Sequence, residues 1–169
     1  MENKSKKVFC FGITNSFEDK TKKLFFNEYD NWSYHDIIEE ATYLSKVFDI
    51  DIYIFKSSEN NYHLISFDIL DFNKYLTIIN WCSNDGDYLY NFYDVNYEYV
   101  LRLSNKGKKN TPMLIKMIKG DLKNENTLSL KHIKAYEYFT GYKIVIGDKK
   151  VLDLDTKIVA YQTNKEKKV

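Results

Sequence analysis

The chain has 169 residues, 44% of them hydrophobic and 17% aromatic, with one proline and six glycines. This length and composition fit one packed domain and exclude a linker-rich or low-complexity protein. The 25 lysines and arginines nearly balance the 24 aspartates and glutamates, and the net charge of +1 excludes a global basic field that recruits nucleic acid. We expect a single domain over residues 1–169, ordered from about 7 to 160, with a frayed tail at 161–169.

Two features of the sequence bear on where the protein works. No run of residues approaches the ~18 apolar residues that span a bilayer, and residues 1–7 lack the apolar core of a signal peptide. Cys10 and Cys82 lack the CxxC spacing of a zinc site, so we expect no zinc and two buried thiols in a reducing compartment. The sequence therefore predicts a cytoplasmic protein without a membrane partner.

The first two strand candidates are residues 7–13 (KVFCFGI) and 22–29 (KKLFFNEY), which are separated by polar turn residues. We expect them to pair as an antiparallel hairpin. Glu28 and Asp30 stand two positions apart at the end of the second strand, so their side chains project from one face. Taken alone, the two carboxylates are a pair of solvated charges at a strand end; together with the motifs below, they indicate a site.

Two helices are predicted from apolar residues at helical spacing. The first covers residues 34–48, where Ser33 and Asp36 form a variant of the capping box. Its buried stripe is expected to hold Ile38, Ala41, Leu44 and Phe48. The second helix covers residues 71–81, and its apolar stripe is expected at Phe72, Tyr75, Leu76 and Ile79, with Ile78 as a further candidate.

A β-hairpin is predicted in the middle of the chain. Residues 50–55 and 62–67 are rich in β-branched and aromatic side chains, and the polar residues 57–61 between them have turn composition. His63 then stands near the start of the second strand, close to Lys56 and the turn serines. Serine hydroxyls and turn N–H groups donate hydrogen bonds, while Lys56 and His63 add positive charge, which suits a nucleotide phosphate. The alternative is a plain surface hairpin.

The second half of the chain begins with a strand region at residues 90–103 that carries Asp94 near its beginning. The basic loop that follows, residues 104–110, concentrates cationic donors together with Arg102, although a charge run of this kind is more often a solvated turn. The remaining predicted elements are strands at 113–118, 142–146 and 151–161, and a helix at 130–139 that ends at Gly141.

The order of these elements and motifs resembles the catalytic core of the archaeo-eukaryotic primase superfamily, which includes primase-polymerase domains. The family's first motif places two acids, one residue apart, at the end of an apolar strand; LFFNEYD at 24–30 resembles it, with Glu28 in the first acidic place. The second motif is a small residue followed by a histidine on a hairpin, which SSENNYH at 57–63 resembles. Tyr93-Asp94 is the best candidate for the third motif, an acid after an apolar residue. The resemblance covers about residues 7–118.

The resemblance implies an α+β fold, with an RNA-recognition-motif-like mixed or antiparallel sheet and helices packed mainly on one face. It implies that Glu28, Asp30 and Asp94 are catalytic acids that hold two divalent ions, Mg²⁺ or Mn²⁺, for in-line phosphoryl transfer. The nucleotide-binding residues that it implies are Lys56, Ser57, His63, Arg102 and Lys106. We expect Glu28 and Asp30 on the strand beside that of His63, with all three facing one cleft.

The function that the resemblance implies is that of a DNA primase/polymerase-like nucleotidyltransferase in replication. Its partners would be nucleoside triphosphates, single-stranded or primed nucleic acid, and a further replication protein. The alternative is a catalytically inactive, nucleic-acid-binding replication accessory domain, because a fold does not fix a function. A third class is a structural protein that oligomerises through aromatic surfaces, which an exposed apolar patch without a carboxylate cluster would indicate.

Overall fold

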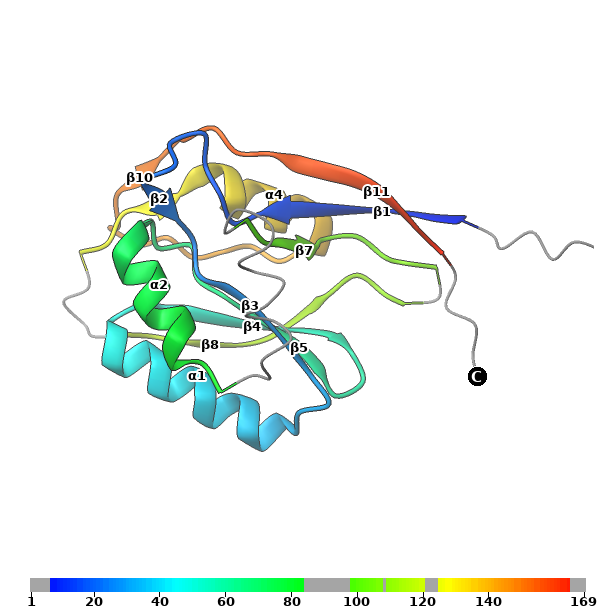
Figure 1. Ribbon diagram of the computed structural model, residues 1–169, viewed down its shortest axis with the longest axis horizontal. Coiled ribbons are helices and arrows are strands. Elements are labelled where there is room, and N and C mark those ends of the chain that lie inside the picture. Colours follow the sequence, from blue (N-terminus) through cyan, green and yellow to red (C-terminus); the bar gives the residue numbers. More distant parts are fainter. Residues whose placement is uncertain (1–6, 84–97, 108, 121–124, 165–169) are drawn as a thin grey trace, which may run out of the picture.

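The described part of the chain consists of a four-stranded sheet, a three-stranded sheet, three helices and short strand pairs (Figure 1). This computed structural model describes residues 7–83, 98–107, 109–120 and 125–164. The architecture is α+β, as the sequence predicted. Among the described helices, none is long and apolar enough to cross a membrane.

The four-stranded sheet is antiparallel throughout. Its strands, in spatial order, are β3 (Phe26–Asp30), β5 (Asn61–Ile65), β4 (Ile52–Ser58) and β8 (Met113–Ile118). The predicted central hairpin is confirmed as β4 and β5, although the turn is shorter than expected and takes only residues 59 and 60. Asn60 makes this tight turn possible because it adopts the left-handed conformation, with φ of 57°.

Helices α1 (Tyr34–Phe48) and α2 (Phe72–Trp81) cover one face of this sheet, where their apolar side chains pack on those of β3, β4 and β5. Both helices were predicted and are confirmed. The start of α1 follows the predicted cap, since the Ser33 hydroxyl accepts a hydrogen bond from the Asp36 backbone N–H at 3.1 Å.

The buried face of α1 differs from the predicted stripe. Ala41 and Leu44 are buried as expected, but Ile38 and Phe48 are part-exposed. The other buried side chains of the helix are those of Ile37, Glu40 and Ser45. Burial of a carboxylate at this position is compensated because Glu40 accepts a hydrogen bond from the Tyr29 hydroxyl at 3.0 Å. Apolar periodicity gives no signal for such a buried polar contact.

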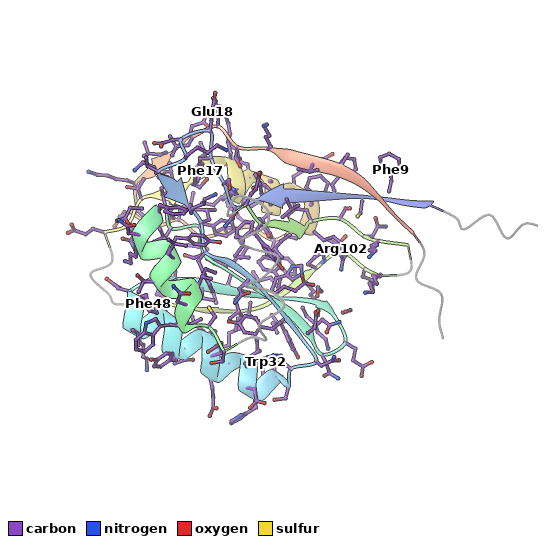
Figure 2. All side chains as sticks on the ribbon, viewed as in Figure 1. Phe9, Phe17, Glu18, Trp32, Phe48 and Arg102 are labelled. Atoms are coloured by element: carbon purple, nitrogen blue, oxygen red, sulfur yellow. The ribbon has the colours of Figure 1, made fainter. Side chains whose placement is uncertain are left out.

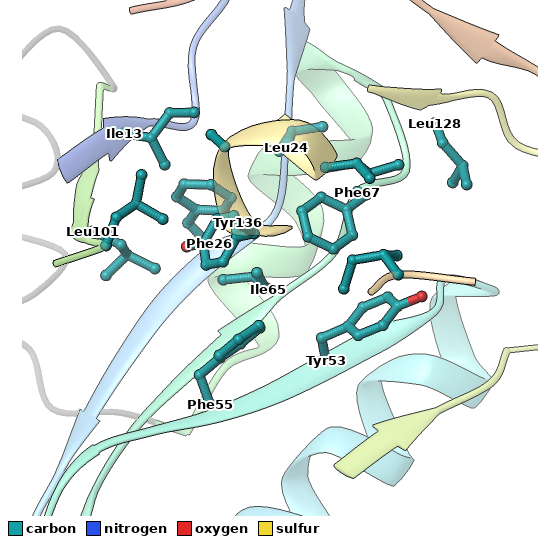
Figure 3. Packing of buried hydrophobic residues seen from close by; sticks show 14 of the residues in the cluster. Ile13, Leu24, Phe26, Tyr53, Phe55, Ile65, Phe67, Leu101, Leu128 and Tyr136 are labelled. Carbon is teal, nitrogen blue, oxygen red and sulfur yellow. The ribbon is translucent and has the colours of Figure 1, made fainter. Parts of the chain in front are cut away.

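The opposite face of the sheet packs against α4 (Leu130–Thr140) and the three-stranded sheet. Figure 3 shows Tyr136 of α4 between side chains of the sheet, next to Phe26 and Phe67. The ring centroids of Tyr136 and Phe55 lie 5.1 Å apart. Two of the three described helices thus cover one face of the sheet, and α4 covers part of the other.

The three-stranded sheet has β1 (Lys7–Thr14) in its centre, between β11 (Ile158–Asn164) and β7 (Val100–Arg102), with antiparallel pairing. The predicted hairpin between residues 7–13 and 22–29 is therefore wrong. β1 pairs instead with a strand from the other end of the chain, and a pairing so distant in sequence has no turn signal between its strands.

The single strand predicted at 22–29 is divided into β2 (Lys22–Lys23) and β3, and its first part forms a smaller pair. Strand β2 pairs antiparallel with β6 (Leu70–Asp71), directly before α2. A second small pair, β9 (Leu128–Ser129) with β10 (Val151–Leu152), is parallel. The single strand predicted at 151–161 is thus two strands, β10 and β11, with irregular chain between them.

Further predictions concern the second half of the chain. Helix α4 ends as predicted at Gly141, which takes a φ of 76°. Residues 142–146 were expected as a strand but form none, and Val145 is largely exposed. Strand β11 extends to Asn164, into the segment expected to fray. Asp94, the rest of the strand region before residue 98, and residues 165–169 lie outside the described residues.

Candidate functional site

A polar cavity of about 420 Å³ opens between the four-stranded sheet and the segment that contains β7 and the basic loop. We call it the cleft. Its lining residues are Glu28, Asp30, Asn31, Ser57, Ser58, Asn61, His63, Val100, Leu101, Arg102, Lys106 and Lys109. The cleft contains all the predicted site residues except Lys56, which lies elsewhere, and Asp94, which lies outside the described residues.

The two acids reach the cleft through strand alternation and register. Glu28 of β3 pairs with His63 of β5, and Asp30 pairs with Asn61. Because directly paired residues share a face of the sheet, Glu28, Asp30 and His63 all point to the side that carries the cleft. The predicted arrangement, with the acids on the strand beside His63 and facing one cleft, is confirmed.

Glu28 lies in an environment that disfavours its charge. Burial of the carboxyl, followed by the neighbouring charge of Asp30, raises the pKa of Glu28. The Tyr99 hydroxyl opposes this by donating a hydrogen bond to Glu28 Oε2 at 2.9 Å. Asp30, by contrast, is exposed. For Glu28, burial and the charge of Asp30 thus outweigh the opposing effects of Tyr99, Arg102 and Lys109.

Tyr99 is a site residue that the sequence did not reveal. Its backbone is fixed by two hydrogen bonds with Asn15: the Tyr99 N–H donates to Asn15 Oδ1 at 2.9 Å, and the Asn15 N–H donates to the Tyr99 carbonyl at 2.8 Å. Burial is the main cause that raises the pKa of Tyr99, so its hydroxyl stays protonated and donates to Glu28. No local pattern indicates this contact because the two residues are far apart in the sequence.

His63 is neutral in this site. The side chain is 3% exposed, and burial, assisted by the charge of Arg102, lowers the pKa of His63 to about 3. Within the described part of the chain, its ring nitrogen Nδ1 has no hydrogen-bond partner. The expectation that His63 adds positive charge is therefore wrong. Its imidazole can instead form a neutral hydrogen bond with a ligand.

A β-bulge brings the two turn serines to the cleft. The register of β4 with β5 shifts between Lys56 and Ser58, which leaves Ser57 as the extra residue. Both serines line the cleft, and the Ser57 hydroxyl donates to the Asn61 carbonyl at 3.3 Å. Lys56 does not line the cleft; the β4 residue that pairs with His63 is Phe55.

Arg102 binds the backbone of the protein itself. Its guanidinium donates to the carbonyls of Ser104 at 2.5 Å, Asn110 at 2.8 Å and Ser57 at 2.8 Å. These contacts join both ends of the basic loop and fasten the loop to the bulge of β4. Arg102 lines the cleft as predicted, but the structure gives it a positioning contact in addition to any contact with phosphate.

The basic loop places two lysines on the wall opposite the acids. Lys106 and Lys109 exchange backbone hydrogen bonds of 2.9 Å, and Gly107 between them takes a φ of 58°, which glycine adopts without strain. Both lysines line the cleft. The acids of β3 thus face the cations of the loop across one cavity.

One group of metal-type ligands lies away from the cleft. His35, Asp36 and Glu39 have ligand atoms within 4.8 Å of one another, but all three are exposed on α1 and form the ion pairs usual on a helix surface. In the cleft, no third His, Cys, Asp or Glu from the described ranges joins Glu28 and Asp30 at that spacing.

The chemistry of the cleft is that of a site for an anion accompanied by a cation. The carboxylates of β3 suit a hard divalent cation, while the lysines of the loop and the serine hydroxyls of β4 suit phosphate oxygens. The sequence matches no protein-family model and no curated protein, and the structure matches no solved structure. The function is therefore inferred from the residues of the cleft.

Proposed function

We propose that the protein is a primase-polymerase-like nucleotidyltransferase that acts in replication, with the cleft as its active site. It would transfer a nucleotide from a nucleoside triphosphate to the 3′-hydroxyl of a single-stranded or primed nucleic acid. The observation that carries this proposal is the pairing of Glu28 and Asp30 with Lys106 and Lys109 on opposite walls of one polar cavity. Phosphoryl transfer needs both signs of charge at one place, because the substrate is anionic and its counter-ions are held by acids.

The basic wall binds the triphosphate in this proposal. Lys106 and Lys109 supply the charge, and the Ser57 and Ser58 hydroxyls supply short, uncharged donors beside them. His63 lies between the serines and the acids and orients a phosphate or sugar oxygen through a neutral hydrogen bond. Because His63 is buried, its position is fixed by packing before the nucleotide arrives.

The acidic wall fits a divalent cation. The raised pKa of Glu28 has two causes, burial and the charge of Asp30, and a bound cation would offset both. When bound, Mg²⁺ or Mn²⁺ supplies positive charge against the phosphate being transferred. Tyr99 holds the orientation of the Glu28 carboxylate through its hydrogen bond to Oε2. Asp30, exposed at the mouth of the cleft, would supply the second carboxylate.

The order of elements around the cleft bears on the proposal. Strand β3, α1, the β4–β5 hairpin and α2 follow one another, and β8 completes the same sheet later in the chain. Along the chain this is the β-α-β-β-α-β order of ferredoxin-like sheets, but β8 pairs with β4 and not with β3, whereas a ferredoxin-like sheet places its last strand beside its first. The short strands β6 and β7 interrupt it, and α4 with the three-stranded sheet is added on the face that carries the cleft.

A second candidate function is that of a nucleic-acid-binding accessory domain without catalysis. Two observations favour it: one Glu28 oxygen already accepts a hydrogen bond from Tyr99, and Glu28 and Asp30 are the only acids among the described residues that line the cleft. A domain that only binds nucleic acid would need the basic wall but would not need the two acids.

Primer synthesis and primer extension with labelled nucleotides, in Mg²⁺ and in Mn²⁺, test the proposal. Asp30→Asn removes one charge with little change of shape, so we expect it to abolish incorporation while the protein remains folded. His63→Ala should weaken nucleotide binding and raise KM, because it removes a nucleotide contact and leaves both carboxylates. Asp36→Asn, an exposed acid on α1, serves as the matched control and should behave as wild type.

Three outcomes separate the candidate functions. Incorporation by wild type and its loss in Asp30→Asn support the transferase. Wild-type inactivity with both metals, together with retained binding of a single strand, favours the accessory domain. A protein that neither incorporates nucleotides nor binds nucleic acid contradicts both.

A further inference from the structure

Several aromatic side chains are exposed near the basic loop. Phe9 and Phe11 of β1 are 59% and 40% exposed, and Tyr138 and Tyr142, at the end of α4 and just after it, are 83% and 38% exposed. Figure 2 shows Phe9 on the outside of β1, at the same end of the molecule as Arg102. We call this set, with Phe139, the aromatic rim. Exposed aromatic residues gathered in one area indicate an interaction surface.

The aromatic rim is continuous with the basic loop. The ring centroids of Phe11 and Phe139 lie 5.7 Å apart, and those of Phe139 and Tyr138 lie 5.1 Å apart. The Phe11 backbone N–H donates to the Ser104 hydroxyl of the loop at 2.8 Å. The rings of two separate elements, β1 and α4, thus meet beside the loop that supplies the lysines of the cleft.

A second hollow, of about 620 Å³, connects this area with the cleft. Ser58 and Lys109 line both cavities. Lys56, absent from the cleft, lines the hollow together with Tyr142, and Glu59 is its one carboxylate within the described residues. A path of cationic and aromatic side chains therefore leads out of the cleft, past Lys109, to Lys56 and Tyr142.

We propose that the hollow and the aromatic rim bind a single-stranded nucleic acid and lead it into the cleft. This inference rests on the proposed function and assigns the strand to a surface. Lysines at intervals along a groove hold the backbone phosphates, while exposed aromatic rings stack on unpaired bases. A double-stranded segment fits this surface poorly because its bases are already stacked. The strand would lie with phosphates near Lys56 and Lys109 and with a base against Tyr142.

The other exposed aromatic pair provides a control. Tyr43 of α1 and Trp81 of α2 stack with ring centroids 6.3 Å apart and are 44% and 54% exposed. They belong to the helices that cover the opposite face of the four-stranded sheet. These aromatic residues match the rim in exposure but not in position.

Fluorescence anisotropy with a labelled oligothymidylate of about 12 nucleotides tests the proposal. Tyr142→Ala should raise Kd about fivefold or more through the loss of one stacked base, and Tyr43→Ala should leave Kd unchanged. Lys109→Gln should lower the slope of log Kd against log salt concentration by about 0.7, the value for one phosphate contact in a single strand. Tyr138→Ala repeats the test at a more exposed ring, where a folding defect is least expected.

The results also separate this inference from the proposed function. Nucleoside triphosphate binding with Mn²⁺, which uses the cleft, is measured on the same variants and should survive Tyr142→Ala and Tyr138→Ala. Weakened strand binding in both rim variants with intact nucleotide binding supports the proposal. Wild-type affinity for the strand in both variants overturns the inference and leaves the proposed function standing, whereas a wild-type protein that binds nucleotide but no strand contradicts both.

Discussion

The two ends of one sheet face differ sharply although the same strands build them. At one end, Phe26, Ile65 and Tyr53 pair across β3, β5 and β4 beneath α4. Two residues further along, the paired positions are Glu28, His63 and Phe55, and beyond them lie Asp30 and the serines. The strands continue, but the covering helix does not extend over the polar end. The apolar end holds the fold together, and the polar end is left for a ligand.

The comparison shows how one sheet serves both stability and chemistry. At the apolar end, buried side chains lose water and gain packing, which is favourable. At the polar end, burial raises the pKa of Glu28 and lowers the pKa of His63 to about 3, so it disfavours the charged form of both side chains. Groups whose charge is disfavoured in the folded protein contribute little to folding, and functional sites are where such groups gather. The predictions below change one end at a time.

The largest effect is expected from truncation at the apolar end. Phe26→Ala removes a fully buried ring whose centroid lies 6.3 Å from that of Tyr136, and should lower the free energy of unfolding by about 3–5 kcal/mol. Ser57→Ala, at the polar end, removes a hydroxyl whose contact is a 3.3 Å hydrogen bond, and should cost about 1 kcal/mol or less. Denaturant melts measure both. Equal losses of unfolding free energy in the two variants would contradict the claim that the apolar end of the sheet face, and not the polar end, holds the fold together.

A pH dependence of intermediate size is expected from the buried histidines. Burial lowers the pKa of His63 from 6.5 to about 3 and that of His132, on α4, from 6.5 to about 4. The unfolded chain therefore binds more protons than the folded protein below pH 6.5, so stability falls as the pH drops through this window. Each histidine contributes up to about 1.4 kcal/mol per pH unit.

Urea melts from pH 7 to pH 4.5 test this dependence. In the His63→Gln variant, the slope of the free energy of unfolding against pH should lose the contribution of His63 and keep that of His132. A slope unchanged by the substitution would show that His63 is not held neutral in the polar end of the sheet.

The smallest effect is a gain of stability at the polar end. The pKa of Glu28 is raised, first by burial and then by Asp30, so its ionised form favours the unfolded chain and stability decreases as the pH rises through its titration. Glu28→Gln should therefore raise the melting temperature at pH 7, and the gain should shrink on acidification, where wild-type Glu28 is itself neutral. Glu39→Gln on the surface of α1 is the control. A loss of stability in Glu28→Gln would mean that the Glu28 carboxylate stabilises the folded protein.

Local patterns predicted the parts of the fold that local interactions form. Ser33 and the apolar spacing after it were enough for α1, and two β-rich runs around a polar turn were enough for the central hairpin. The pairing of β1 with β11 could not be predicted, since its strands lie at opposite ends of the chain. Strand alternation also placed Glu28 and Asp30 on one face without any knowledge of the partner strand.

The sequence predicted most residues of the candidate site but not their charge states. The cleft gathers Glu28, Asp30 and His63, but the neutral state of His63 follows from burial, which depends on packing by distant elements. The one-residue bulge that turns both serines into the cleft has no sequence signature here. The contact of Tyr99 with Glu28 joins parts of the chain that only the fold brings together.

The most direct test of the central claim is a calorimetric titration of the protein with a nucleoside triphosphate in the presence of Mn²⁺. We expect saturable binding by wild type, lost or strongly weakened in Asp30→Asn and in Lys106→Gln, which change opposite walls of the cleft. Asp36→Asn should bind as wild type does. Absence of binding by wild type, or equal binding by all four proteins, would contradict the claim that the polar end of the sheet face is a nucleotide site.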